Sequence, residues 1–134
     1  MNHKSCRIAV FVSGTGTNLL QLLKNETSGI LRGKIAFVIA SKLCKALEFA
    51  NQYEIPSKII SKKNFTSDES FTHSLIESLA PFQVNLIVLA GFMEILPECF
   101  FSQFQGEIIN IHPSLLPSFS GKDAVKQALD YGVK

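Results

Sequence analysis

The sequence has few of the features that mark membrane, secreted or nucleic-acid-binding proteins. Its longest apolar runs, such as Ile8–Val12 and Leu86–Ala90, are far shorter than the roughly 20 residues of a bilayer-spanning helix. The first run is also too short for the core of a secretion signal. The net charge is only +2, with no basic stripe and no aromatic cluster of the kind found in RNA-binding sheets. We therefore expect no membrane segment and no nucleic-acid partner.

Cysteine is scarce as well. Cys6, Cys44 and Cys99 are odd in number, and no two of them have Cys-x-x-Cys spacing. This pattern predicts neither a disulfide framework nor a zinc site, so we expect no bound metal. A reduced, cytoplasmic location is the simplest interpretation.

What remains is an ordinary globular composition. The chain has 134 residues, of which 46% are hydrophobic and 18% charged. A chain of this length is the size of one domain and can bury about 65–70% of its unfolded surface. No internal repeat, linker or low-complexity segment divides it, so we expect one domain over residues 1–134.

Strand-like and helix-like segments alternate along this domain, which predicts an α/β fold with a parallel sheet. The runs Leu86–Ala90 and Ile108–Ile111 have the composition of strands that are buried on both faces. The other expected strands are Ile8–Val12, Lys34–Ala40 and Ser57–Ile60, and the expected helices are Leu19–Lys24, Leu43–Tyr53, a helix from Ser67 to about Ala80, a short helix opened by Pro97, and Asp123–Leu129.

Helical spacing also predicts which side chains face the core. The second helix should turn Leu43, Ala46, Leu47 and Ala50 inward, with Lys42 and Lys45 in solvent. The third should turn Phe71, Leu75, Ile76 and Leu79 inward, with His73 at the surface. Ser67 has the character of an N-cap, but Ser70 stands where a capping box would have Glu or Gln, so the sequence supports the N-cap alone. Phe100, Phe101 and Phe104 form an expected core patch.

The first strand runs into a glycine-rich turn, Ser13-Gly-Thr-Gly-Thr-Asn18, followed by a helix. Such a turn lets backbone N–H groups and a helix N-terminus face an anion, although many such turns serve only close packing. The third glycine of the dinucleotide fingerprint is absent, and so is the lysine of a Walker A loop. No acidic residue follows the second strand, where Ala40-Ser-Lys stands. A single phosphate monoester is therefore a better ligand for this turn than NAD or ATP.

A second polar group follows the fifth expected strand. Asn110 and His112 alternate with Ile111, so both side chains should point to the same side. In a parallel sheet this pair should lie beside Gly91-Phe-Met-Glu94, because ligands bind past the carboxyl ends of the strands. An amide donor next to an imidazole suits a developing oxyanion and a moving proton. The alternative is a hydrogen-bonded strand end without chemistry.

The segment Asn110-Ile-His-Pro-Ser-Leu-Leu-Pro117 resembles the signature of the folate-dependent formyltransferases. Leu89-Ala-Gly-Phe-Met93 with Ile95-Leu96 is similar to the folate-pocket segment of one member, and the resemblance runs from Ile8 to the last residue. It implies a Rossmann-like open, mainly parallel sheet with helices on both faces. It also implies that residues 1–134 form a single domain that lacks the family's C-terminal portion.

The resemblance further implies transfer of a formyl group from the co-substrate 10-formyltetrahydrofolate to the amine of glycinamide ribonucleotide, in purine biosynthesis. Asn110 and His112 match the family's catalytic residues. By the same resemblance, Gly16, Thr17 and Asn18 hold the substrate phosphate. We expect a monomer or weak homodimer. The residues matched to the folate site are Leu89, Met93, Glu94, Ile95, Leu96 and Asn110.

Three positions depart from the family's pattern. The aspartate that orients the family's histidine would come after Lys134, and Asp68, Asp123 and Asp130 are no obvious substitutes. Glu94 stands where members often carry Arg. Asp68 aligns near a folate-contacting Arg of some members, and the nearest cations are Lys62 and Lys63.

Other functions stay open at this point. Members of the same family formylate methionyl-tRNA or hydrolyse formyltetrahydrofolate, and they share the Asn-x-His pattern. From a different class, a chain without the orienting aspartate is compatible with a catalytically inactive module that binds a phosphate ligand.

Overall fold

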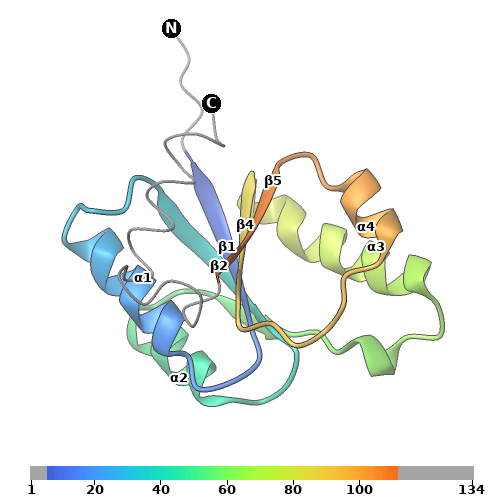
Figure 1. Cartoon of the computed structure of the whole chain (residues 1–134), viewed down its shortest axis with the longest axis horizontal. Helices are drawn as coiled ribbons and strands as arrows, with labels where there is room; N and C mark the ends of the chain where they lie inside the picture. Colours follow the sequence, from blue (N-terminus) through green and yellow to red (C-terminus); the bar gives the residue numbers. More distant parts are fainter. Residues whose placement is uncertain (1–5, 112–134) are drawn as a thin grey trace, which may run out of the picture.

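A computed structural model describes residues 6–111 as a parallel sheet between two layers of helices (Figure 1). The strand order is β3-β2-β1-β4-β5, and every paired strand runs parallel to its neighbour. This is the Rossmann-like fold that the alternating pattern and the resemblance predict. The strands are β1 (Arg7–Val12), β2 (Lys34–Ala40), β3 (Ser57–Ile59), β4 (Leu86–Ala90) and β5 (Glu107–Ile111).

The helices cover the two faces of the sheet in pairs. In Figure 1, α1 and α2 lie on one side of the strands, and α3 and α4 lie on the other. The helices are α1 (Thr17–Thr27), α2 (Lys45–Gln52), α3 (Asp68–Leu79) and α4 (Glu98–Gln103), with short 3-10 turns η1 (Lys62–Asn64) and η2 (Ala80–Phe82).

Strand β1 lies in the middle of the sheet and supplies both halves of the core. Its even-numbered residues, Ile8, Val10 and Val12, pack with α1 and α2. Its odd-numbered residues, Ala9 and Phe11, pack with α3 and α4. Because successive side chains of a strand point to opposite faces, a continuous apolar run is what a strand covered on both sides requires.

Two inward positions expected from helical spacing are wrong. Leu43 is 82% exposed, because α2 begins at Lys45 and leaves Leu43 in the preceding loop. Phe101 is 51% exposed, whereas its neighbour Phe100 is fully buried. Adjacent residues of a helix point about 100° apart, so the short helix α4 turns only one of these two rings inward. The other inward positions on α2 and α3 are buried or half-buried, and Lys42, Lys45 and His73 are exposed as expected.

The N-terminus of α3 is better capped than the sequence indicates. Ser67 Oγ accepts a hydrogen bond from Ser70 N at 3.1 Å, and Ser67 N donates to Ser70 Oγ at 3.4 Å. A complete capping box therefore forms with serine in the place of Glu or Gln. A hydroxyl group can take this place because it both accepts and donates.

Strand β5 is not buried on both faces as expected. Glu107 and Asn110 are exposed, and Ile108 and Ile109 are half-buried. Among residues 6–111, β5 pairs only with β4 and ends the sheet. The expected helix Asp123–Leu129 lies outside the described residues.

Candidate active site

The turn after β1 presents the N-terminus of α1 at the carboxyl edge of the sheet. Gly16 is the N-cap of this helix and has a left-handed backbone with φ of 81°. No side chain within residues 6–111 caps the helix, so the first-turn N–H groups around Thr17 and Asn18 carry the positive end of its dipole. Such N–H groups can bind an anion, and the phosphate-binding role of Gly16–Asn18 stays a prediction.

Helix α2 fixes the shape of this turn. Ala46 N donates a hydrogen bond to Gly14 O at 3.3 Å. A Cβ atom at Gly16 would lie 2.6 Å from Ala46 Cα and 2.9 Å from Ala46 Cβ. The turn is therefore in backbone contact with the start of α2, and glycine is required at position 16 for space as well as for conformation.

The loop after β4, residues 91–96, presents apolar side chains to solvent at the same edge. Met93 and Ile95 are each 79% exposed, whereas Leu96 is only 7% exposed and anchors the end of the loop in the core. Leu89 is half-buried at the end of β4. This arrangement of exposed apolar tips on an anchored loop offers a surface for a flat, apolar ring.

A buried serine joins the two loops. Ser13 is 1% exposed, and its Oγ accepts a hydrogen bond from Met93 N at 2.8 Å. The same Oγ lies 2.5 Å from Ser41 Oγ, which follows β2. The loops that follow β1, β2 and β4 are therefore connected through one hydroxyl group.

The loop after β4 is also held from the side of β3. Glu94 Oε1 accepts a hydrogen bond from Lys62 N at 2.7 Å, and Glu94 Oε2 accepts one from Ser61 Oγ at 3.4 Å. In return, Lys62 Nζ donates to Ile95 O at 3.1 Å and lies 3.8 Å from Asp68 Oδ1. Glu94 and Asp68, which depart from the family's pattern, thus both contact Lys62, Glu94 through the backbone N–H and Asp68 through the ammonium group.

Asn110 is the one predicted catalytic residue that the structure describes. It is exposed near the end of β5, in register with Leu89 of β4, and Ala90 is in register with Ile111. Asn110 therefore lies next to the base of the loop formed by residues 91–96. His112 falls outside the described residues, and its position beside Asn110 stays a prediction.

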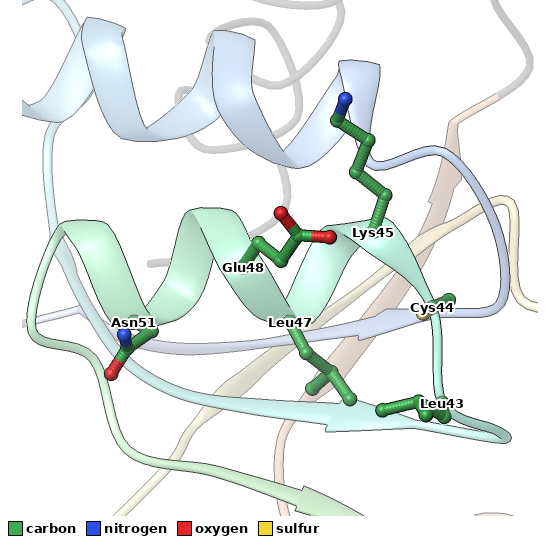
Figure 2. A pocket seen from close by; sticks show the side chains of 6 residues that line it. All are labelled: Leu43, Cys44, Lys45, Leu47, Glu48 and Asn51. Atoms are coloured by element: carbon green, nitrogen blue, oxygen red, sulfur yellow. The ribbon is translucent and has the colours of Figure 1, made fainter.

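A separate open groove of about 510 Å³ lies on α2 and the residues before it (Figure 2). It shares no residue with the predicted site, and its lining comes from residues 43–51 alone, so it lacks the converging loops of an active site. Figure 2 shows its lining side chains, which are Leu43, Cys44, Lys45, Leu47, Glu48 and Asn51.

Sequence reasoning missed the contacts that connect these loops, although it found the loops themselves. Ser13 and Ser41 are each the first residue after one of two adjacent parallel strands, and this shared position was the available signal. The contacts of Glu94 with Ser61 and Lys62 had no comparable signal, because the loop conformation brings together segments that are more than 30 residues apart.

Metal-binding and membrane-spanning features do not occur in this part of the chain. Between residues 6 and 111, no three His, Cys, Asp or Glu side chains gather in a way that could bind a metal ion. The three cysteines are free thiols, and burial raises the pKa of the Cys6 thiol above its ordinary value. None of the helices within the same range has the length and hydropathy of a membrane span.

Comparison with known proteins assigns the sequence to one family. Residues 6–134 match the model of the family described as formyl transferase. Phosphoribosylglycinamide formyltransferase of Haemophilus influenzae is 40% identical over 127 residues, which are 94% of this chain and 60% of that protein. The trifunctional purine biosynthetic protein adenosine-3 of Bos taurus is 40% identical over 131 residues, or 97% of this chain and 13% of that protein. The chain thus spans only part of these relatives.

Solved structures have the same fold. Glycinamide ribonucleotide transformylase 1 from Geobacillus kaustophilus superimposes with a TM-score of 0.77 at 36% identity, over 97% of this chain and 70% of that one. Phosphoribosylglycinamide formyltransferase from Coxiella burnetii gives a TM-score of 0.76 at 38% identity, over 96% of this chain and 61% of that one. The predicted fold class is therefore confirmed.

Proposed function

The chain belongs to the formyl transferase family, and on this premise we propose that it transfers a formyl group from 10-formyltetrahydrofolate to the amine of glycinamide ribonucleotide in purine biosynthesis. The observation that carries the proposal is the meeting of three features at one edge of the sheet: a helix N-terminus that no side chain of residues 6–111 caps, an exposed apolar loop, and Asn110. A phosphorylated amine and a folate need these features side by side. The names of relatives at about 40% identity support formyl transfer to glycinamide ribonucleotide in purine biosynthesis.

Gly16, Thr17 and Asn18 hold the phosphate of the ribonucleotide in this proposal. The first-turn N–H groups of α1 donate to its oxygens, and the helix dipole favours its negative charge. The side chains of Thr17 and Asn18, which are exposed and half-buried respectively, can add donors. The phosphate then fixes one end of the substrate so that its amine points towards β4 and β5.

The residues after β4 fit a folate. Met93 and Ile95 offer exposed apolar contacts for a pteridine ring, and Leu96 is buried at the end of the same loop. Leu89 is half-buried at the end of β4, in register with Asn110. Backbone N–H and C=O groups of the loop, including Glu94, can read the polar edge of the ring. The bound folate supplies the formyl group.

Asn110 and His112 carry the chemistry. As the neutral amine attacks the formyl carbon, Asn110 donates a hydrogen bond to the oxygen that becomes negatively charged. His112 assists there and carries a proton, directly or through water, from the attacking nitrogen to the departing nitrogen. In the family, an aspartate in the C-terminal portion, after the segment that residues 6–134 match, would orient His112. Residues 1–134 act as one domain together with that part, in the cytoplasm, as a monomer or weak homodimer.

A comparison of acceptors tests this proposal in the full natural chain. With 10-formyltetrahydrofolate present, we expect rapid formation of formylglycinamide ribonucleotide, with little formylation of methionyl-tRNA and little formate release when no acceptor is present. Preference for methionyl-tRNA, or formate release that is indifferent to glycinamide ribonucleotide, would assign one of the other family activities. Binding of the ribonucleotide without turnover would indicate an inactive ligand-binding module.

A further inference from the structure

The loop formed by residues 91–96 is held at three consecutive residues by polar groups from other parts of the chain. Met93 N donates to Ser13 Oγ, the Glu94 carboxylate accepts from Lys62 N, and Ile95 O accepts from Lys62 Nζ. These distances are 2.8, 2.7 and 3.1 Å. Met93 and Ile95 are held through backbone atoms, and the side chains of both residues are exposed.

We propose that Ser13 and Glu94 are positioning residues that set the backbone of this loop for the folate. The inference rests on the proposed function and adds to it two residues that act through Met93 and Ile95. Neither side chain needs to touch a substrate. A loop fixed before binding loses less conformational freedom when the ligand arrives, so these contacts raise affinity for the folate.

The side chain of Ser13 makes contacts that its place in the sequence does not suggest. By its place in the turn after β1 it belongs with the phosphate-binding residues. Its hydroxyl is nonetheless buried and engaged with Met93 N and Ser41 Oγ, away from the first turn of α1. The phosphate turn has its own supports, which are the contact of Gly14 O with Ala46 N and the close packing of Gly16. Removing the Ser13 hydroxyl should therefore affect the folate rather than the ribonucleotide.

Glu94 is suited to the same task by its geometry. One carboxylate oxygen accepts from a backbone N–H at 2.7 Å, which is typical of a strong charge-assisted hydrogen bond. The other oxygen is 3.4 Å from Ser61 Oγ. Glutamine has the same length and can accept from Lys62 N with its carbonyl oxygen, so it should preserve the contact, whereas alanine should lose it.

The test measures KM for 10-formyltetrahydrofolate and for glycinamide ribonucleotide in the full natural chain, for the wild type, Ser13→Ala, Glu94→Ala and Glu94→Gln. We expect each alanine variant to raise KM for the folate about three- to tenfold, as the loss of one hydrogen bond would, and to change KM for the ribonucleotide less than about twofold. Glu94→Gln should stay close to the wild type. Ser102→Ala and Glu77→Ala serve as matched controls, because both residues are exposed and lie on α4 and α3.

The KM values separate the possible outcomes. A larger effect of Ser13→Ala on the ribonucleotide than on the folate would place Ser13 in the phosphate site and overturn its assignment here. An unchanged KM for the folate in Glu94→Ala would overturn the role of Glu94. An equal rise of this KM in Glu94→Ala and Glu94→Gln would also overturn it, and would indicate that the negative charge itself matters. If Ser13→Ala does not fold, the Glu94 pair still decides the proposal. A wild type that does not use the folate would overturn the proposed function as well.

Discussion

Gly16 combines a backbone angle and a contact that other residues do not tolerate. Its φ is +81°, and a Cβ atom there would meet the backbone of Ala46 at 2.6 Å. We expect Gly16→Ala to lower the free energy of unfolding by about 2–4 kcal/mol, since left-handed strain and overpacking each cost about 1–3 kcal/mol. Urea denaturation measures this change.

Gly14→Ala is the matched control for that measurement. Gly14 lies two residues away in the same turn, a Cβ atom added to it would meet nothing within 4 Å, and its φ lies outside the left-handed region. The stability of this variant should stay within about 1 kcal/mol of the wild type. Equal losses in the two variants would show that the contact with α2 does not constrain the turn.

Met93 is a residue of the proposed folate site that can be substituted without disturbing the core. Its side chain is 79% exposed, so a change there should leave the fold intact. We expect Met93→Asp to weaken binding of a non-reactive folate analogue about tenfold or more, because it places a charge against an apolar ring. Leu43→Asp is the control, since Leu43 is 82% exposed in a different loop. Fluorescence titration that finds equal affinities in both variants and the wild type would remove Met93 from the folate site.

At the scale of single elements, the N-terminus of α1 allows the most specific test. If its N-terminus is the phosphate site, a sulfate or phosphate ion soaked into crystals should lie on the backbone N–H groups of residues 16–18. Lys62 and Lys63 are the competing cationic position, but Lys62 is already in contact with Ile95 O and Asp68. Density for the ion at those lysines alone would indicate that the turn after β1 serves packing and does not bind the phosphate.

Helix α3 allows a test of its unexpected cap. Ser67→Ala removes the acceptor of Ser70 N and should lower the free energy of unfolding by about 1 kcal/mol. Ser70→Ala should cost less, because it keeps the bond from Ser70 N to Ser67 Oγ, which satisfies a free N–H group of the first turn. It removes instead the contacts of Ser70 Oγ with Ser67 N, O and Oγ, at 3.4, 3.0 and 3.1 Å. Thermal unfolding measures both variants, with Ser102→Ala as the control because it replaces an exposed serine on α4. A larger loss in Ser70→Ala than in Ser67→Ala would contradict the geometry of the capping box.

The elements also show what the sequence could and could not predict. The sequence predicts each described strand to within one residue. Apolar runs mark β1, β2, β4 and β5, as covered parallel strands require, whereas β3 follows Pro56 and has no such run, and its three residues are all exposed. Helix α1 was expected at Leu19–Lys24 but spans Thr17–Thr27. Its polar ends lack the apolar spacing that marks a helix, so only its middle was visible in the sequence.

The sequence predicts which loops form the candidate site, but not the hydrogen bonds that connect these loops. Glycine spacing and the formyltransferase-like segments located Gly16–Asn18 and residues 93–96. The hydrogen bonds that Met93 N and the Glu94 carboxylate make depend on how the loops fold against one another, and no local pattern encodes that arrangement. The geometry of Asn110 relative to His112 lies beyond the described residues and stays a prediction.

At the scale of the whole molecule, the strand order explains why distant segments form one site. Strands β1, β4 and β5 are consecutive neighbours in the sheet, and all run in the same direction. Their carboxyl ends therefore bring together residues 13–18, 91–96 and Asn110 at one edge. The parallel strands thus place residues that are far apart in the sequence next to one another at the proposed site.

The most direct test of the whole account is the turnover of the full natural chain with Asn110→Ala and His112→Ala. Formyl transfer to glycinamide ribonucleotide should fall about 10²–10³-fold in kcat for each variant, with KM for both substrates changed only a few-fold, because both residues act mainly in the transition state. An active wild type whose kcat is unchanged by both substitutions would contradict the assignment of the site.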